Sequence, residues 1–252
     1  MEKSILYLGD TSLEISAYYL AGVMQLSGIK FDYVSTSQPF SADMLKKGYN
    51  VVILSDYPAS KFTPEQLDLL KSSVSDGGLG LVMIGGWESF VGQNANYNKT
   101  VMKDVLPVIM KDTDDRVNWF GPCIIEKTSE HPIIASLPLD EQLPVVGGFN
   151  EVKAKPNAVT VLSVRRFSVA KAGNVFSFSA ESINPLLVVG TCGRGHVAAF
   201  MSDAAPHWVG GLVDWGSKRV CAQAPGAEAI EVGNYYATLF ANIIRWAAND
   251  KL

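Results

Sequence analysis

The first 85 residues alternate between short apolar runs and amphipathic segments, and this alternation constrains the fold more than any other feature of the sequence. The apolar runs have the length of buried strands and are too short for buried helices. They span Ser4–Gly9, Phe31–Ser35, Val51–Ser55 and Leu79–Ile84. Strands that are apolar throughout and alternate with helices are typical of a parallel sheet covered on both faces.

Three helices are predicted between these strands. Apolar residues at helical spacing from Leu13 onward predict the first helix, which ends before Gly28. The second is a short helix over Ser41–Lys47 that begins at a serine cap. The third has the clearest start in the chain, because Thr63-Pro64-Glu65-Gln66 combines an N-cap, a proline at the first helical position and a capping box.

The rest of the chain predicts a different kind of structure. Residues 91–150 are less regular, with a short helix at Val101–Val105, an edge strand at Leu106–Met110 and a solvated acidic cluster at Asp112–Asp115. Further strands separated by turns are predicted at Ala158–Val164, Val175–Ala180, Leu186–Gly190 and His196–Ser202. A helix over Tyr235–Ala248 closes the chain with one apolar stripe. The prediction is a single α/β domain over residues 1–252, a flavodoxin-like three-layer sandwich whose mainly parallel central sheet carries an antiparallel strand extension in the C-terminal half.

Composition narrows the classes of partner. The net charge is −4 and no run of Lys and Arg exceeds two residues, which argues against nucleic acid and anionic membranes as partners. No apolar window is long enough for a transmembrane helix. Three widely spaced cysteines predict neither a disulfide framework nor a structural zinc site. We therefore expect a reduced, cytoplasmic protein that needs no cofactor or metal.

Polar residues follow several of the predicted strands. Ligands of parallel α/β sheets bind beyond the carboxyl ends of the strands, where this sequence places Asp10, Asp56 and the segment Gly85-Gly86-Trp87-Glu88-Ser89. Gathered carboxylates could bind a cation or transfer protons. Asp and Ser also favour turns because they bond their own backbone, so the turn explanation stays open for each residue taken singly.

A second candidate cluster follows the last predicted strand. Asp203 ends that strand and His207 comes four residues later, a pair that could orient a base or bind a ligand. Pro206 argues against a regular helix joining them. The full set of ligand-binding candidates is Asp10, Asp56, Gly85, Gly86, Trp87, Glu88, Ser89, Asp203 and His207, and no catalytic residue is assigned.

Other residues have competing structural explanations. Cys192 in Gly-Thr-Cys-Gly-Arg-Gly resembles a nucleophile elbow, but a strand follows it where an elbow needs a helix. His131 and His196 are most simply structural. The Gly-rich segment Trp208–Trp215 could line a pocket, pack in the core or form the surface of a homo-oligomer.

The order of these motifs resembles the class I glutamine amidotransferase-like superfamily, and within it bacterial proteins related to the trehalose-utilisation type. The motifs are the alternating first half, Gly85-Gly86, His131-Pro132-Ile133, the run from Gly193 to Asp203 and the C-terminal aromatic helix. The resemblance implies that the Gly-Gly loop helps to form an oxyanion hole. It also implies a Gly-x-Cys-x-Gly elbow on the next strand and a later His-x-Glu pair, and this sequence has neither.

Three hypotheses about function follow. The first is a member of this fold without glutaminase activity that binds a small polar ligand or a partner at the strand ends, with N–H donors around Gly86 and Trp87. The second is a hydrolase or carbohydrate-modifying enzyme that uses Glu88, Asp203 and His207 without a covalent cysteine. The third is an oligomeric assembly protein.

Overall fold

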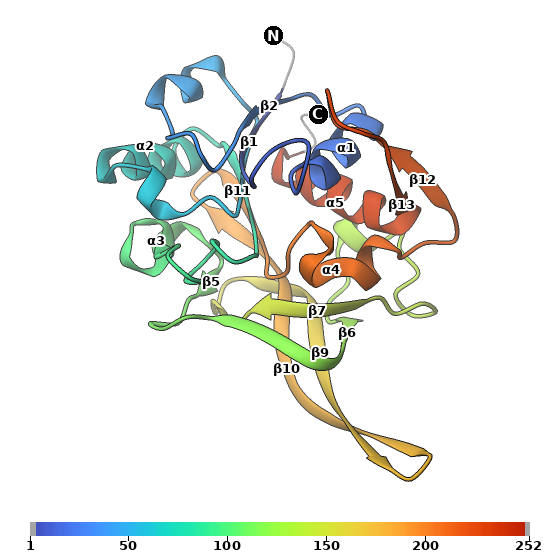
Figure 1. The fold of residues 1–252 in the computed structure, drawn as a ribbon. Helices are drawn as coiled ribbons and strands as arrows, with labels where there is room; N and C mark the ends of the chain where they lie inside the picture. The colour runs from blue at the N-terminus through green and yellow to red at the C-terminus, as the bar shows by residue number, and fades with distance from the viewer. Residues whose placement is uncertain (1–3, 250–252) are drawn as a thin grey trace.

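The computed structural model describes residues 4–249, and a nine-stranded mixed sheet runs through it (Figure 1). The strand order is β2-β1-β3-β4-β11-β10-β9-β6-β7. The first five are parallel: β2 (Phe31–Val34), β1 (Ile5–Gly9), β3 (Val51–Ser55), β4 (Gly80–Ile84) and β11 (Gly195–Phe200). The other four are antiparallel: β10 (Val175–Cys192), β9 (Val159–Ala172), β6 (Arg116–Lys127) and β7 (Val145–Asn150). The predicted α/β fold with its antiparallel extension is confirmed.

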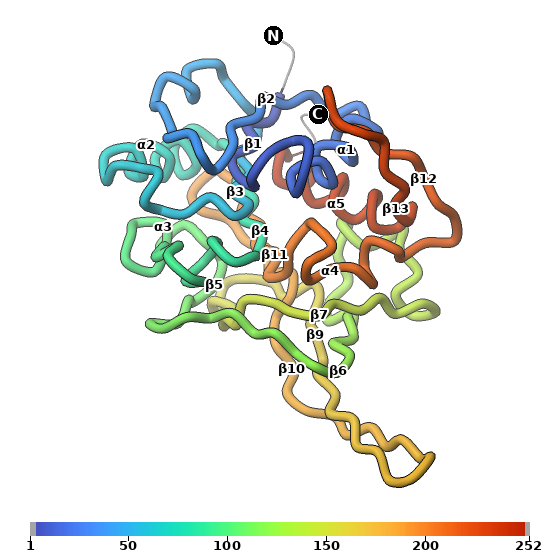
Figure 2. Tube along the Cα trace, in the orientation of Figure 1, coloured from blue at the N-terminus to red at the C-terminus, as the bar shows by residue number. Residues whose placement is uncertain are grey.

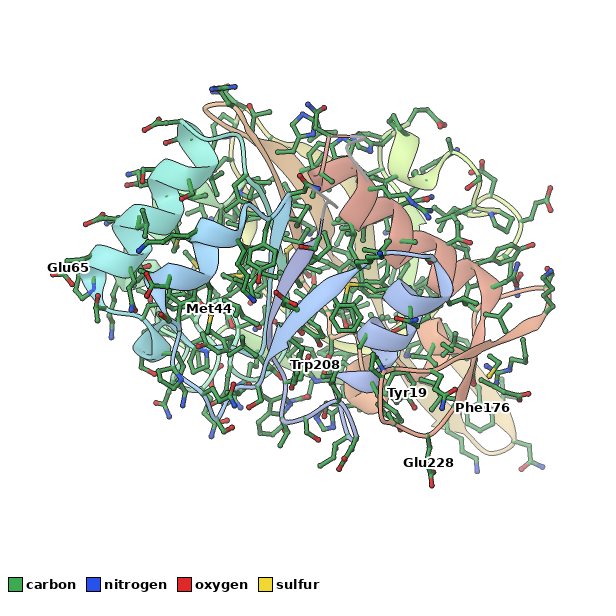
Figure 3. The ribbon with its side chains drawn as sticks, turned by 90° about the horizontal axis from the view of Figure 1, so that it is seen from above. Tyr19, Met44, Glu65, Phe176, Trp208 and Glu228 are labelled. Carbon is green, nitrogen blue, oxygen red and sulfur yellow. The ribbon has the colours of Figure 1, made fainter. Side chains whose placement is uncertain are left out.

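Helices cover both faces of the parallel half. Helix α5 (Asn234–Ala247) packs against β4, β11 and α1 (Tyr18–Leu26), whereas α2 (Pro64–Ser75) contacts β11 and α3 (Met102–Val105). Figure 3 shows α2, with Glu65 at its outer end, on the opposite side of the sheet from α5. Every residue of β1, β3 and β4 is buried, as expected for strands covered on both faces. No helix within residues 4–249 is long and apolar enough to span a membrane.

Local helix signals had mixed outcomes. The capping box of α2 is confirmed, because Gln66 N donates to Thr63 Oγ1 at 3.3 Å and Thr63 N donates to Gln66 Oε1 at 2.8 Å. Helix α1 begins at Tyr18, later than the apolar spacing indicated, because turns occupy residues 13–17. The segment Ala42–Lys47 is a 3-10 helix, and the Ser41 side chain makes no capping hydrogen bond.

The middle of the chain is more ordered than its composition indicated. Strands β6 and β7 of the main sheet were not predicted. The predicted edge strand at 106–110 shrinks to β5 (Val108–Ile109), which pairs with β8 (Lys153–Ala154) in a separate two-stranded sheet. A second small sheet joins β12 (Arg219–Ala222) to β13 (Ile230–Gly233), and helix α4 (Pro206–Val213) begins at its proline.

Four predicted C-terminal strands correspond to three strands in the structure, two of which are long. Strand β9 continues eight residues past the predicted end at Val164, and β10 joins two predicted strands into one of 18 residues with register shifts at its bulges. Strand β6 pairs with β9 only as far as Arg166. The hairpin beyond that point, residues 167–180, projects from the body (Figures 1 and 2). We call it the arm.

Candidate functional site

Three aspartates, Asp10 and Asp203 buried and Asp56 half-buried, gather at the carboxyl edge of the parallel strands. Asp10 directly follows β1, Asp56 directly follows β3, and Asp203 comes three residues after β11. Asp10 and Asp203 are each only 5% exposed. Because β1, β3, β4 and β11 are neighbours in the parallel sheet, these three predicted site residues lie at the same edge, and the charges of Asp10 and Asp56 help to raise the pKa of Asp203.

Asp10 and Asp56 occupy equivalent places in adjacent strands. Both lie in the left-handed region, with φ of 53° and 45°, which Asp tolerates better than most side chains. Asp10 N donates to the carbonyl of Ser55 at 2.9 Å. A Cβ on Gly9 would lie 1.6 Å from that carbonyl oxygen, so only glycine allows the two strand ends to approach so closely. Non-glycine residues held in this conformation cluster at functional sites.

Burial makes the carboxylates of this cluster weak acids. It raises the pKa of Asp10 to about 6 and that of Asp56 to about 7, where the charge of Asp10 adds to the effect. The pKa of Asp203 rises well above its ordinary value for the same reasons. The hydroxyl of Tyr7 donates to Asp10 Oδ2 and partly offsets the rise there. Near neutral pH, Asp56 can therefore act as a hydrogen-bond donor as well as an acceptor.

A threonine that the sequence analysis missed connects two of these loops. The Thr36 hydroxyl lies 3.0 Å from the carbonyl oxygen of Asp10 and 2.7 Å from that of Asp56. Thr36 follows β2, so the strand-end rule that pointed to Asp10 also covers it. Thr36 also directly follows the predicted strand Phe31–Ser35, as Asp10 directly follows the predicted strand Ser4–Gly9.

A polar cleft of about 500 Å³ opens in front of Asp10 and Asp56. Its lining residues come from the loops after β1, β2, β3 and β4, and Trp87 is the only apolar side chain among them. They are Asp10, Thr11, Ser16, Thr36, Ser37, Asp56, Lys61, Trp87, Glu88 and Gln93. We call this the aspartate cleft. A hollow of about 650 Å³ beside β5 and β8 is larger, but it lies away from the strand ends.

The Gly-Gly loop directs its N–H groups into the protein. Gly86 N donates to Asn150 Oδ1 at 2.9 Å, and Glu88 N donates to Asp56 Oδ1 at 2.7 Å. Gly86 has a φ of 151°, and a Cβ there would lie 2.3 Å from Asp56 Oδ1. Asp56 N in turn donates to Ser89 Oγ at 3.0 Å. The Gly86 N–H is thus already paired, contrary to the expectation that it would be a donor to a ligand.

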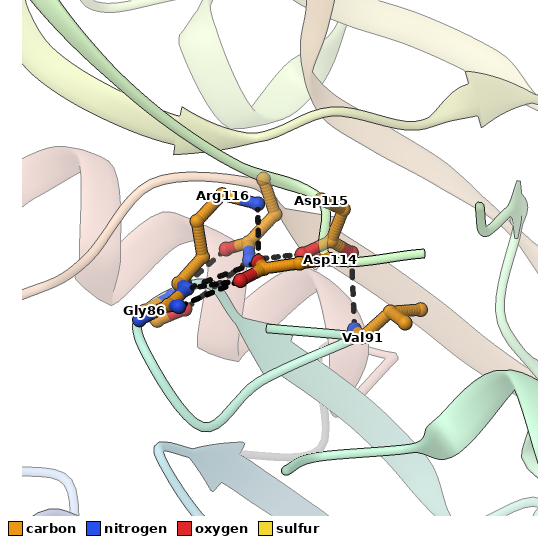
Figure 4. A network of polar contacts seen from close by, with 6 residues as sticks. Gly86, Val91, Asp114, Asp115 and Arg116 are labelled. Atoms are coloured by element: carbon orange, nitrogen blue, oxygen red, sulfur yellow. Dashed lines mark hydrogen bonds and ion pairs between the residues drawn. The ribbon is translucent and has the colours of Figure 1, made fainter. Parts of the chain in front are cut away.

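Asn150 and Asp115 hold this loop from the antiparallel half. Figure 4 shows Asp115 beside Val91 and Gly86. Asn150 Nδ2 donates to Asp115 Oδ1 at 2.8 Å and to the Gly86 carbonyl at 3.1 Å, while Val91 N donates to Asp115 Oδ2 at 3.0 Å. Asp115 is fully buried, and burial raises its pKa to about 6. The prediction that residues 112–115 are solvated surface is therefore wrong for Asp115.

Trp87 lies between the cleft and His207. Its indole is 39% exposed, and the Arg116 guanidinium stacks 4.6 Å from its ring centroid. The exposed His207 ring contacts it edge-on at 5.4 Å, from the first turn of α4. The predicted partner of His207, Asp203, bonds its own loop: its Oδ1 accepts a hydrogen bond from Ala205 N at 2.9 Å.

The residues of the proposed hydrolase do not form a linked group. Within residues 4–249, no hydrogen bond or ion pair joins Glu88, Asp203 and His207. The same part of the chain contains no group of His, Cys, Asp and Glu side chains arranged to hold a metal ion.

The cysteines lie away from the aspartate cleft. Cys192 pairs with Gly195 in the hairpin that starts β11, at the opposite end of that strand from Asp203, and burial raises the pKa of its thiol. Cys123 is buried in β6 and Cys221 is exposed in β12. Strand β4 pairs directly with β11, and the next strand along the chain is the two-residue β5 of another sheet. Within residues 4–249, the first strand after the Gly-Gly loop is therefore not a parallel strand of the main sheet, which is where a nucleophile elbow would be expected.

The two indoles at the ends of the segment Trp208–Trp215 are buried in the core. Trp208 is 2% exposed and Trp215 is 3% exposed within the single chain. The indole N–H of Trp208 donates to Asn118 Oδ1 at 2.7 Å, and that of Trp215 donates to the Gln142 carbonyl at 3.0 Å. These indoles are therefore not available as the surface of a homo-oligomer.

Comparisons with known proteins agree with this architecture. Two cytoplasmic proteins of Salmonella typhimurium share the fold. The first has 28% identity and a TM-score of 0.73, over 97% of this chain and 98% of that chain. The other, from strain LT2, has 26% identity and a TM-score of 0.72 over 97% of this chain and 99% of that chain. A protein from Thermoplasma acidophilum, described as a "putative gmp synthase subunit a protein", shares the fold at 11% identity and a TM-score of 0.53, over 100% of this chain and 97% of that chain.

The family comparison covers most of the chain, whereas no curated protein matches it. Residues 7–222 match the family model described as "Putative glutamine amidotransferase", a span that includes the aspartate cleft, the Gly-Gly loop and Asp203. The chain belongs to the class I glutamine amidotransferase-like family.

Proposed function

We propose that this protein binds a small, neutral, hydroxyl-rich molecule in the aspartate cleft and does not hydrolyse glutamine through a cysteine. The observation that carries the proposal is the lining of the cleft, which combines carboxyl groups and hydroxyl groups with one partly exposed indole. Sugar-like ligands present hydroxyls that both donate and accept hydrogen bonds, and the lining groups do the same.

The charge of the cleft supports a neutral ligand. Three carboxyl groups, those of Asp10, Asp56 and Glu88, face one cation, Lys61, which disfavours phosphates and carboxylates. Burial raises the pKa of Asp10 to about 6 and that of Asp56 to about 7, so a divalent metal would compete with protons for these carboxyl groups. The Trp87 ring adds an apolar face against which the carbon skeleton of a sugar can pack.

A thermal-shift screen tests the ligand class. A sugar or polyol at about one hundred times its Kd should stabilise the fold by about 2.7 kcal/mol and raise the midpoint by roughly 5–10 °C. Glu88→Ala should reduce the shift, because it removes a carboxylate from the lining. Glu228→Ala, at an exposed site away from the cleft, is the matched control and should keep the full shift. A midpoint that rises only with phosphates, amino acids or divalent metals would contradict the proposal.

Glutamine hydrolysis is the second test. Ammonia release from glutamine should stay at the background rate for the wild type and be unchanged by Cys192→Ala, because no thiol lies at the cleft. Release that exceeds the background and disappears in the Cys192→Ala variant would refute the absence of cysteine chemistry.

The same proposal includes a cytoplasmic location and a relationship to the trehalose-utilisation type. The Salmonella relatives, described as cytoplasmic proteins, support the location. The acidic balance of 25 Asp and Glu against 21 Lys and Arg supports neither nucleic acid nor membrane as the partner.

A further inference from the structure

The arm has one apolar face and one small, polar face. Residues that pair directly across an antiparallel ladder share a face. One face therefore carries Phe167, Val169, Lys171, Phe176, Phe178 and Ala180. The other carries Ser168, Ala170, Ala172, Val175, Ser177 and Ser179. The position of Lys171 Nζ, 5.5 Å from the Phe176 ring centroid, agrees with this assignment.

Nothing in the described chain covers the apolar face near the tip. Phe176 is 58% exposed and Phe178 is 63% exposed, and the arm strands pair only with each other. A two-stranded hairpin is at best marginally stable in water unless another layer packs on it. Apolar side chains grouped on such a projection mark an interaction surface.

We propose that this face binds the same face of a second copy of the chain, with the two arms crossing tip to root about a two-fold axis. A two-fold interface pairs a surface with itself, so an amphipathic arm is self-complementary. A second copy of the apolar face therefore offers the apolar partner surface that this face lacks within the described chain.

The charges of the arm fit this crossing. Between Phe167 and Ile183 the only charged side chains are Lys171, close to the tip, and Glu181, at the root. In a tip-to-root arrangement, Lys171 of each copy approaches Glu181 of the other. A parallel arrangement would instead place like charges together.

The apolar face supplies about half of the area that a stable dimer needs, and the root of the arm would have to supply the rest. A phenylalanine presents about 150–250 Å² when fully exposed, so the apolar face supplies on the order of 400 Å². A stable interface buries about 800 Å² per partner. The tip of each arm would reach the root of the other, where Trp119 bonds the Phe167 carbonyl and Phe120 is 80% exposed, and this contact adds to the area.

Sedimentation equilibrium tests the proposal on the full chain. The wild type should have twice the chain mass of 27.2 kDa, and the double variant Phe176→Ser/Phe178→Ser should dimerise at least tenfold more weakly. Val175→Ser, equally exposed on the opposite face, is the matched control and should remain dimeric. Lys171→Glu should weaken the dimer, and adding Glu181→Lys should restore it.

Three results would overturn the proposal. They are a monomeric wild type at high micromolar concentration, a dimer that survives the double Phe variant, or a dimer lost equally in Val175→Ser. A wild-type protein that is monomeric and binds another protein through the arm is a case of the first result and would also overturn the proposal. Circular dichroism and the thermal midpoint of each variant separate loss of the dimer from loss of the fold. If the double Phe variant is misfolded, the charge reversal and its rescue decide the question.

Discussion

Replacing Asn150 with alanine should lower the free energy of unfolding by more than about 3 kcal/mol, because three buried polar groups lose their partner at once. These are the Gly86 N–H, the Gly86 carbonyl and Asp115 Oδ1. Asn150 and Asp115 are both fully buried, so water cannot replace the missing side chain without entering the core. Urea denaturation measures the change.

A control and a local readout accompany this experiment. Asn94→Ala, at an exposed site, should change the stability by less than about 0.5 kcal/mol. Hydrogen exchange at the Gly86 amide should accelerate in the Asn150→Ala variant and stay slow in the control. A loss below about 1 kcal/mol, with the Gly86 amide still protected, would show that the loop does not depend on this network.

The second large effect concerns pH. A carboxyl group whose pKa is higher in the folded protein than in the unfolded chain stabilises the fold below the unfolded pKa, and this contribution is lost as the pH rises through the folded pKa. For Asp56 these values are 3.8 and about 7. Asp56→Asn should therefore gain stability relative to the wild type, by roughly 3–4 kcal/mol, between pH 4 and pH 8.

The difference in unfolding free energy between the wild type and the Asp56→Asn variant, followed over pH, isolates the contribution of Asp56. Asp10, Asp115 and Asp203 change stability with pH in the same direction, whereas His131, whose pKa burial lowers, acts in the opposite direction. These contributions occur in both proteins and largely cancel in the difference. The exception is that the pKa values of Asp10 and Asp203 fall somewhat when the neighbouring Asp56 charge is removed. Denaturation curves at pH 4.5, 6 and 7.5 provide the comparison. A stability difference that is independent of pH would show that Asp56 is not a weak acid in the folded state.

The parallel half of the fold and part of the site were predictable because their signals are local. The apolar runs that became β1, β3 and β4 fix which residues stand at the strand ends, so the sequence alone places Asp10 and Asp56 at one edge of the sheet. The capping box of α2 was likewise confirmed because all its atoms lie within four residues. The same rule covers Thr36, which directly follows the predicted strand Phe31–Ser35.

The residues that support the Gly-Gly loop could not be found in this way. Asn150 reaches Gly86 from 64 positions away along the chain, and Asp115 looks like part of an acidic surface run. Their burial depends on β7 lying against the end of β11, where Asn150 N donates to the Met201 carbonyl at 2.7 Å. Periodicity carries no information about such a contact. The prediction cut β9 short at Val164 and divided β10 at residues 181–185, where register shifts and Pro185 interrupt the regular strand pattern.

The direct pairing of β4 with β11 has a consequence for synthesis on the ribosome. Leu81 of β4 is paired with Val197, 116 residues later in the chain. At translation rates of about 5–20 residues per second, one edge of β4 waits roughly 6–23 s for its partner to be made. During that interval a fully apolar strand presents unpaired N–H and C=O groups, which is the kind of edge that recruits other chains. The nascent N-terminal half should therefore be the aggregation-prone stage in the life of this protein, and the point at which a chaperone would matter most.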